Sequence, residues 1–285
     1  MKLSKAICAG WMVVPTMVFA QSVTLYGVVD TGIEYLNRTS RGDHGLVRMN
    51  NLSASVPSRW GLRGSEDLGG SLKAAFVLES GFAPDSGVSN QAGRLFGRQA
   101  WVGLSGPWGQ VALGRQYSML FWATLDADML GPNTFGSSSL DSYMGNPRAD
   151  NAISYKGKFG GVTIGATYSF GRDAAPAGAS CAGENPGDQS ACREWSTLLG
   201  YNTDAWGVAI AYDSLRGGAA AAGNLTSSGM KDDRLSLSGY TNVGKAKIGG
   251  GWIRRDNDAN VVTPRSDLWY GGVSYAVTPA FSLDG

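Results

Sequence analysis

Apolar and polar residues alternate with a period of two from residue 23 to the end of the 285-residue chain, in short segments separated by turn residues. In one segment Ile164, Ala166 and Tyr168 alternate with Gly165 and Thr167. A period of two places successive side chains on opposite faces of a β-strand, so one face is apolar and the other wettable. The chain is therefore predicted to be nearly all strand.

Short and long connections between these segments alternate along the chain. Short, glycine-bearing joints occur at 67–70, 106–109, 159–161 and 242–245, and long polar ones at 37–50, 171–193, 217–231 and 256–265. A soluble β-sandwich also alternates along its strands, but this order of connections is typical of a membrane β-barrel with short periplasmic turns. Lipid offers the backbone no hydrogen bonds, so we expect the sheet to close on itself.

Aromatic residues at the strand ends favour the same fold, because aromatic girdles mark the two bilayer interfaces of such barrels. The aromatic residues concerned are Tyr35, Trp60, Phe82, Trp101, Phe170, Trp195, Tyr201, Trp206, Trp252 and Trp269. After residue 20 no stretch approaches the 18 or more apolar residues of a membrane-spanning helix. The prediction is an all-β, antiparallel transmembrane barrel.

The first twenty residues have the order of a secretory signal peptide. Lys2 and Lys5 precede a mostly apolar stretch, and Val18 and Ala20 supply the small residues before a cleavage site after Ala20. We therefore divide the chain into a signal peptide, 1–20, and a barrel, 21–285.

The composition excludes some partners. The 42 glycines are about twice the usual share, and charged residues are only 16% where soluble domains have roughly a quarter. The formal net charge is +1, and the basic residues are scattered among acidic ones. Nucleic acid is therefore not an expected partner.

Three cysteines are present, and Cys8 belongs to the signal peptide. In an oxidising periplasm Cys181 and Cys192 favour a disulfide that braces a loop rich in Gly, Pro and Ala, with two free thiols as the alternative. Two cysteines at this spacing do not form a zinc site. No metal or cofactor is predicted.

Several motifs, taken together in their order along the chain, carry a family resemblance. They are LYG at 25–27, WGLRGSEDLGG at 60–70, LKAAF at 72–76, LESGF at 78–82, GRQAWVGL at 97–104, LGRQY at 113–117, and Arg148 with Asn151, Ser154 and Tyr155. In these residues the chain resembles the trimeric general porins of Gram-negative bacteria, of the β-proteobacterial type.

The resemblance implies a sixteen-stranded barrel, a homotrimer in outer-membrane lipid, and passive diffusion of small hydrophilic solutes and ions. It also implies a third loop, about 119–147, that folds into the lumen and sets acidic residues against basic residues of the wall. The wall positions are Arg59, Arg63, Arg98, Arg115 and Arg148, and the loop positions are Asp126, Asp128 and, more weakly, Asp141. The plain alternative is that each arginine is merely a solvated residue on a polar face.

Two departures from the family pattern bear on selectivity. The loop tip at 131–136 has no carboxylate, and Val28 stands where relatives often have a basic residue on the first strand. Five wall cations against two or three carboxylates predict a modest preference for anions, since rings of Arg or Lys favour them. We also expect Lys73 and Glu79, on one face of the same strand, to form an ordinary wall salt bridge.

The C-terminal residues depart from the family pattern as well. Such porins resemble one another in ending on an aromatic residue, whereas this sequence stops at FSLDG, 281–285, which reads as the beginning of a thirteenth strand. We therefore expect a barrel that stops after 12 to 13 strands, with three to four absent. Either the sequence is a fragment or its product does not insert normally, because open edges are costly in lipid.

Other functions have weaker support. An enzyme in the same scaffold would need a base, but His44 is the only histidine and lies in a loop with no Gly-x-Ser-x-Gly or metal-ligand run. A substrate-specific channel would need a lumenal binding site, for which the aromatic residues near the third loop leave room; these are Tyr117, Phe121, Trp122, Phe135 and Tyr143. More often such residues anchor the loop. An adhesin or purely structural barrel would not conduct.

Overall fold

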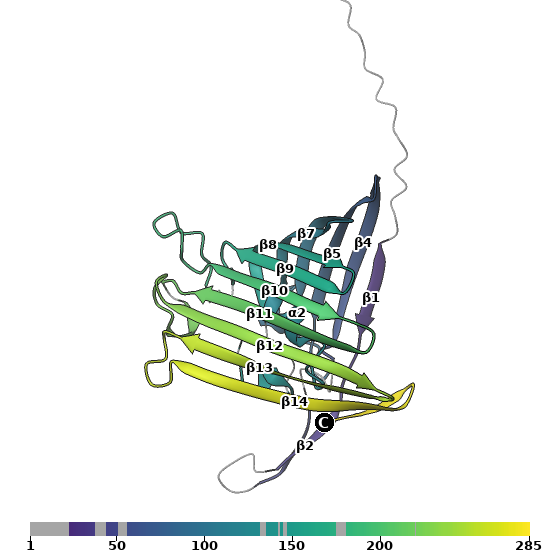
Figure 1. Ribbon diagram of the computed structural model, residues 1–285. Helices are drawn as coiled ribbons and strands as arrows, with labels where there is room; N and C mark the ends of the chain where they lie inside the picture. Colours follow the sequence, from purple (N-terminus) through teal and green to yellow (C-terminus); the bar gives the residue numbers. More distant parts are fainter. Residues whose placement is uncertain are drawn as a thin grey trace, which may run out of the picture.

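The computed structural model describes residues 23–37, 44–50, 56–131, 135–141, 143–144, 147–174, 181–219 and 221–285. The predicted signal peptide lies outside these ranges. Within them the chain forms a strongly curved antiparallel sheet of thirteen strands and a separate hairpin (Figure 1). No helix of the described residues is long and apolar enough to cross a membrane. The all-β prediction is confirmed.

The sheet keeps the order of the chain, so nearly every strand pairs with the strands before and after it. Its strands are β1 (Thr24–Val28), β4 (Arg59–Gly69), β5 (Leu72–Gly81), β6 (Gln99–Gly106), β7 (Gly109–Tyr117), β8 (Arg148–Phe159), β9 (Val162–Ser169), β10 (Glu194–Asn202), β11 (Trp206–Arg216), β12 (Lys231–Val243), β13 (Ala246–Asn257), β14 (Arg265–Thr278) and β15 (Phe281–Asp284). Thirteen strands match the 12 to 13 expected from the sequence.

The exception to this order lies near the N-terminus. There β1 pairs with β4, because β2 (Ile33–Leu36) and β3 (Leu46–Met49) form their own two-stranded sheet. The short helical turns are α1 (Asn90–Gly93), α2 (Met119–Thr124), η1 (Ser137–Ser139) and η2 (Ala222–Asn224). In the described residues the edge strands β1 and β15 do not pair with each other, so the sheet is open here, where closure was predicted.

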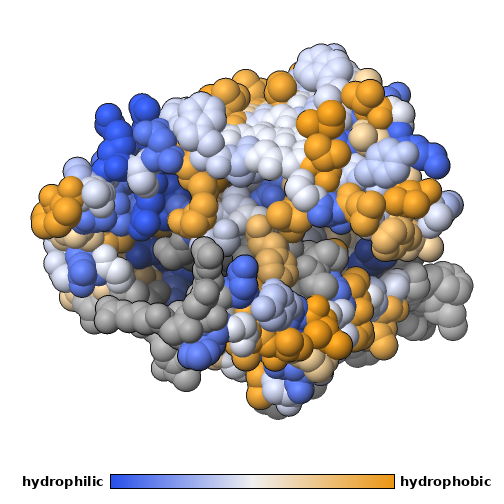
Figure 2. Space-filling view, turned by 90° about the horizontal axis from the view of Figure 1, so that it is seen from below, coloured by the Kyte–Doolittle hydropathy of each residue, from blue (hydrophilic) through white to orange (hydrophobic). Residues whose placement is uncertain are grey.

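The outer face of the sheet is apolar, as the alternation predicts. Strand pairing aligns one row of outward side chains across six neighbouring strands: Ile164, Leu199, Ile210, Leu237, Trp252 and Trp269. Of these, Leu199 is 55% and Trp269 74% exposed, although both are large and apolar. Apolar residues also recur around the rim in the space-filling view from below (Figure 2). Such a surface is stable against hydrocarbon and unfavourable in water.

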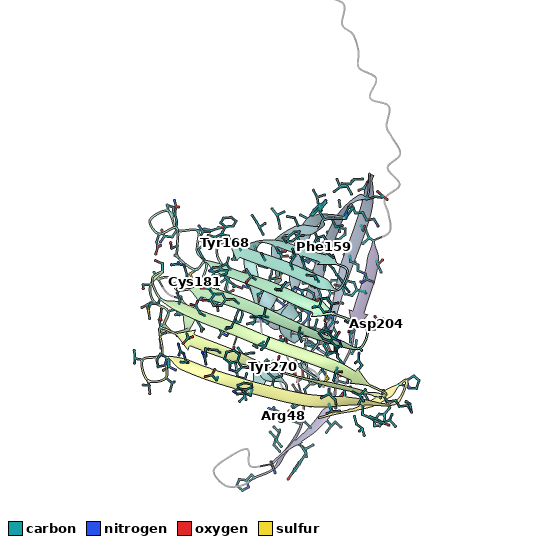
Figure 3. The ribbon with its side chains drawn as sticks, viewed as in Figure 1. Arg48, Phe159, Tyr168, Cys181, Asp204 and Tyr270 are labelled. Carbon is teal, nitrogen blue, oxygen red and sulfur yellow. A yellow bond between two sulfur atoms is a disulfide. The ribbon has the colours of Figure 1, made fainter. Side chains whose placement is uncertain are left out.

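Aromatic side chains gather at both ends of the outer face. At the short-turn end Tyr201 and Trp206 pack with ring centroids 5.6 Å apart, and at the other end Trp195 and Tyr212 lie 5.1 Å apart. The ends themselves are distinguished by loop length: Phe159 and Asp204 mark short turns at the right of Figure 3, and Cys181 lies among the long connections at the left. This arrangement agrees with the predicted girdles and with the predicted alternation of short and long loops.

The inner face is wettable over much of its area but apolar where the chain folds back. One level of it carries the aligned row Gly165, Leu198, Ala211, Ser236, Ile253 and Leu268. Met119, Leu120 and Ala123 of α2 are buried against Leu198 and neighbouring members of this row. The hydrophobic core therefore lies inside the curved sheet, between the wall and one inward segment.

Candidate functional site

The described residues between β7 and β8, within 118–147, run along the inner face of the sheet, and we call them the inward segment. Two hydrogen bonds fix its helical start: the Met119 amide donates to Ser196 Oγ at 2.9 Å, and Ser238 Oγ donates to the Ala123 carbonyl at 2.6 Å. Figure 1 shows α2 enclosed by the sheet, at the level of β11. Residues 132–134, 142 and 145–146 of this segment lie outside the described part of the chain.

Three of the predicted arginines, Arg59, Arg98 and Arg148, gather opposite the inward segment, and we call them the arginine cluster. Arg98 and Arg148 each donate an Nη2 hydrogen bond of 2.7 Å to the hydroxyl of Tyr117. Arg98 Nε also donates to Glu79 Oε1 at 2.7 Å, and Arg59 Nε lies 3.5 Å from the other Glu79 oxygen. Three guanidinium groups thus surround one carboxylate and one phenol.

A cavity of about 390 Å³ separates the arginine cluster from the inward segment. The arginines, Glu79 and Tyr117 line one side of it, and Gly131 and Ser138 line the other. Arg98 and Arg148 are only 5% and 7% exposed, so their positions are fixed by contacts and not by solvent. An ion in this cavity meets a positive wall, because Arg59 and Arg98 share the single carboxylate of Glu79, which offsets only part of their charge.

Aromatic packing holds the start of the inward segment against this wall. The rings of Tyr117 and Phe121 are stacked, with centroids 3.9 Å apart and planes inclined by 13°. Trp122 meets both rings edge to face, and the Arg148 guanidinium lies 4.3 Å from the centroid of Tyr117. Tyr117 therefore connects the arginines to the aromatic stack through both its hydroxyl and its ring.

The other two predicted arginines have different surroundings. Arg115 Nη1 donates to Asp150 Oδ1 at 2.6 Å, and Asp150 also binds Arg94 at 3.2 Å. Arg94 in turn pairs with Asp173, so two arginines and two carboxylates form a balanced group. Arg63 is exposed and lies over the ring of Tyr26, 5.2 Å from its centroid. Neither Arg63 nor Arg115 lines the cavity described above.

The predicted loop carboxylates lie in three separate places. Asp126 is exposed, and its Oδ1 is 3.9 Å from Lys247 Nζ. Asp128 is buried and accepts a 2.7 Å hydrogen bond from the Ser137 amide of its own segment. Asp141 forms a 3.0 Å ion pair with Arg234 of β12. These contacts direct the three carboxylates away from the arginine cluster.

The Asp141 contact belongs to a second charged group that the sequence analysis did not find. Arg234 also lies 3.2 Å from Asp232, and Arg255 of β13 donates to Asp232 at 2.7 Å. Burial alone would raise the pKa of Asp141, but the adjacent Arg234 guanidinium and the Tyr143 amide lower it below its usual value. The inward segment is therefore anchored to β12 by a buried, ionised carboxylate.

The expected salt bridge between Lys73 and Glu79 is wrong. Glu79 pairs with Arg98 and Arg59 instead. Six residues along a strand span about 20 Å, so two side chains on one face of β5 at that spacing do not meet. The signal that was missed is cross-strand: Glu79 pairs in register with Gln99 and Gly61, next to Arg98 and two residues from Arg59.

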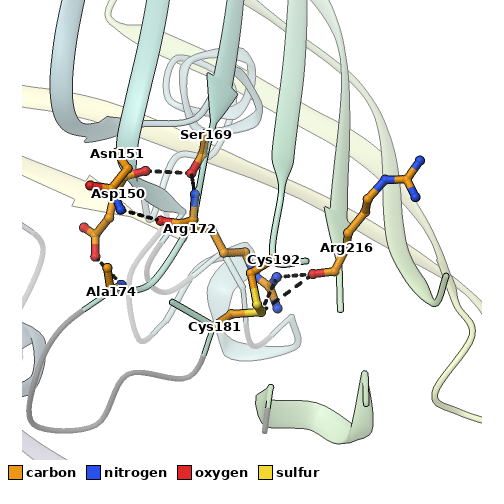
Figure 4. Close-up of a disulfide and its surroundings, with 9 residues drawn as sticks. Asp150, Asn151, Ser169, Arg172, Ala174, Cys181, Cys192 and Arg216 are labelled. Atoms are coloured by element: carbon orange, nitrogen blue, oxygen red, sulfur yellow. Dashed lines mark hydrogen bonds between the residues drawn. A yellow bond between two sulfur atoms is a disulfide. The ribbon is translucent and has the colours of Figure 1, made fainter. Parts of the chain in front are cut away.

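The structure also joins Cys181 and Cys192 in a disulfide. It lies among the long connections, where Arg172 donates to Cys181 Sγ and to the Arg216 carbonyl (Figure 4). Ala221 and Leu225 of the connection between β11 and β12 pack around the two sulfurs. The disulfide therefore braces two neighbouring long loops at one end of the barrel.

Comparison with known proteins adds the family. Residues 6–284 match the family model described as Gram-negative porin. An outer membrane porin protein of Bordetella pertussis is 34% identical over 278 residues, which cover 90% of this chain and 67% of that protein. Outer membrane porin protein 32 of Delftia acidovorans is 38% identical over 165 residues, covering 52% of this chain and 44% of the relative.

Solved porin structures are also similar to this chain. The anion-selective porin from Comamonas acidovorans superposes with a TM-score of 0.69 at 26% sequence identity, covering 92% of this chain and 76% of that one. OmpF of Salmonella typhi gives 0.61 at 15% identity, covering 90% and 75%, and shows the likeness of fold alone. The chain thus belongs to the Gram-negative porin family of the bacterial outer membrane.

Proposed function

We propose that this protein is a general porin, a passive channel for small hydrophilic solutes and ions with a mild preference for anions. The observation that carries the proposal is the arginine cluster, in which Arg59 and Arg98 share the carboxylate of Glu79 beside the 390 Å³ cavity. The similarity to a structure described as an anion-selective porin supports the same preference. A positive wall at a narrow point raises the local concentration of anions and lowers that of cations.

The placement of the loop carboxylates supports this sign. In a constriction with an acidic loop the two signs would balance, but Asp128 and Asp141 are bound by other partners. Asp126 lies toward Lys247. The positive side of the cavity thus has no matching acidic side among the described residues.

Bilayer recording tests the proposal. In a salt gradient across a planar bilayer the wild-type reversal potential should lie on the anion side, and Arg59→Gln with Arg148→Gln should move it toward cations. Glutamine keeps hydrogen-bonding capacity while removing the charge. The control is Arg254→Gln, which changes an exposed arginine that pairs with Asp267 away from the cavity. An unchanged reversal potential in the double variant, with normal conductance, would remove the arginine cluster from the ion path.

A substrate-specific channel is the second candidate, and the aromatic residues decide how much support it has. Tyr117, Phe121 and Trp122 pack against one another, and Tyr143 is held by Glu194, so these rings anchor the inward segment. Phe135 is 40% exposed, so part of its side chain faces solvent. Swelling of liposomes in sugars of rising size separates the two: a size cutoff without chemical preference supports a general porin, and saturable uptake of one solute supports a specific channel.

We also propose that the working form is a homotrimer. The outer face carries exposed apolar side chains from β1 onward, such as Leu25 at 68%, and a second copy of the chain would cover part of that surface as lipid covers the rest. A heat-modifiable band at three times the monomer mass, converted to monomer on boiling, is the expected result on a gel.

A further inference from the structure

A second pocket, of about 280 Å³, lies on the other side of α2 from the arginine cluster. Trp122 lines both cavities, so it stands between them. Ala123, Asp126 and Ala127 of the inward segment also line it, and the remaining lining residues belong to the parts of β8, β9, β10, β11 and β12 toward the short turns. We call it the short-turn pocket; its end of the barrel faces the periplasm in proteins of this architecture.

One side of the short-turn pocket is cationic. Lys156 and Lys158 occupy alternate positions of β8 and so share its inner face. The Lys156 ammonium lies 3.4 Å from the centroid of Trp122, a contact that positions the charge without neutralising it. Among the described residues neither lysine forms an ion pair.

The opposite side is mostly small and apolar, with polar groups from Thr163, Asn202, Ser238 and Tyr240 around it. Gly200, Gly207 and Gly239 contribute no side chains to this side, which we call the glycine floor, so the apolar side chains that project from it are Ala209 and Leu198. Ala123 and Ala127 of the inward segment close the pocket from above. A surface of this kind gains free energy when it is covered by hydrocarbon and gains nothing from a sugar hydroxyl.

We propose that the short-turn pocket binds a small organic monocarboxylate with a compact apolar body. Its carboxylate would lie at Lys156 and Lys158, and its hydrocarbon would cover the glycine floor. An inorganic anion would leave the apolar floor exposed to water, and a neutral sugar would leave the half-buried Lys156 ammonium without a counter-ion. The pocket deepens the proposed function, since it rests on anions reaching this end of the channel past the arginine cluster.

Two changes test separate halves of the site, with benzoate as the probe. Lys156→Gln and Lys158→Gln each remove one charge and should weaken benzoate binding to the detergent-solubilised full chain by about fivefold. Gly200→Val keeps both lysines but fills the floor. A Cβ at Gly200 meets its nearest neighbours, the Val208 carbonyl and the Ala209 Cβ, at 3.5 and 3.7 Å, so the backbone accepts the substitution without a clash.

The matched control is Lys73→Gln, a lysine of β5 at the same end of the barrel and outside the pocket, which should bind benzoate like the wild type. Equilibrium dialysis with labelled benzoate measures affinity without any need for conduction. Loss of affinity in the lysine variants and in Gly200→Val, but not in Lys73→Gln, supports the site. Undiminished binding in Gly200→Val would overturn it, because the lysines would then attract benzoate only as surface charge.

Conductance in potassium chloride, recorded on the same preparations, separates this inference from the proposed function. A protein that binds benzoate as described but conducts no ions would refute the channel and leave the pocket. A protein that conducts normally and binds no benzoate would refute the pocket alone. When both hold, benzoate added from the short-turn side should reduce chloride conductance, and the lysine variants should need about fivefold more of it.

Discussion

The hydroxyl of Tyr143 donates a 2.6 Å hydrogen bond to Oε1 of Glu194, across 51 residues of sequence, and so joins the inward segment to β10. Asp213 of β11 lies 3.4 Å from the same hydroxyl, and both carboxylates are fully buried. Burial raises the pKa of Tyr143 well above its usual range, and the two carboxylates raise it further. The phenol therefore stays protonated, and stays a donor, throughout the physiological range.

Replacing Tyr143 by Phe should weaken this attachment. The ring remains, but Glu194 loses the donor that satisfies it in a buried place, at a cost of about 1–3 kcal/mol. The free energy of unfolding of the detergent-solubilised protein in guanidinium chloride measures the loss, and single-channel records should show more frequent current fluctuations. Tyr201→Phe, at a 44% exposed position of the outer face, is the control. Equal stability of the two variants would contradict a structural role for this hydroxyl.

The attachment through Asp141 should depend on pH. The neighbouring Arg234 holds the pKa of Asp141 below its unfolded value, near 4, so the ionised carboxylate stabilises the fold above that value. The contribution is lost as the pH falls through the lower, folded pKa. Asp141→Asn should therefore be less stable than the wild type by about 2 kcal/mol at pH 7, and the difference should shrink below about pH 4. A difference that stayed constant from pH 7 into strong acid would show that the charge is not what matters.

The sequence predicts the strands and their faces well, because the alternation is a local property. Ile164, Leu199 and Ile210 each alternate with small or polar neighbours, and each is exposed on the outer face as expected. The register between neighbouring strands decides which residues lie side by side, and the short turns fix that register. In two of these turns Gly160 and Gly244 adopt positive φ of 61° and 60°, which glycine does without strain. The positions of Arg59, Arg98 and Arg148 on the wall came from the family resemblance and not from the alternation.

The pairing of charges could not be predicted in this way. Asp150, which follows the inward segment, binds both Arg115 of β7 and Arg94, which lies in the connection between β5 and β6. Asp141 binds Arg234, 93 residues away. These contacts depend on how irregular segments fold against the wall, and no periodicity reports that. The resemblance set Asp126, Asp128 and Asp141 opposite the wall arginines at 59–148, whereas their contacts in the structure are with Lys247, the Ser137 amide and Arg234.

The two kinds of wall arginine should differ in effect. Arg148 belongs to a cluster with excess positive charge, whereas the charge of Arg115 is balanced by Asp150. Arg148→Gln should therefore shift the reversal potential toward cations more than Arg115→Gln does. Arg115→Gln should instead lower stability by about 1–3 kcal/mol, because its bond to the Gly97 carbonyl and its ion pair are both buried. A larger change of reversal potential in Arg115→Gln than in Arg148→Gln would contradict this, because ions would then pass Arg115 and Asp150 and not the cavity beside the arginine cluster.

The outer face should reject charge. Ile210 lies in the middle of β11, between the outward side chains of Leu199 and Leu237. Ile210→Arg should lower the free energy of folding into lipid vesicles by about 2–4 kcal/mol, the depth-dependent cost of a cation on a lipid-facing wall. Ala209→Ser, at the neighbouring inward position, should cost much less. Comparable effects of the two substitutions would mean that this face does not contact hydrocarbon.

The disulfide should stabilise the long loops without affecting ion selectivity. It closes a loop of 11 residues' separation, for which the chain-entropy model gives about 3 kcal/mol. Its loss removes the Sγ acceptor of Arg172 and the covalent link that holds Cys181 to Cys192, leaving the 2.8 Å hydrogen bond from the Cys192 amide to the Gly217 carbonyl to hold this part of the loop. Cys181→Ala with Cys192→Ala should therefore be cut by trypsin after Arg172 or Arg193 faster than the oxidised wild type, and at the same rate with or without reductant. The reversal potential should not change, since the arginine cluster lies on other strands. Equal cleavage of the oxidised wild type and the double variant would mean that the hydrogen bonds around the loop, and not the disulfide, hold it closed.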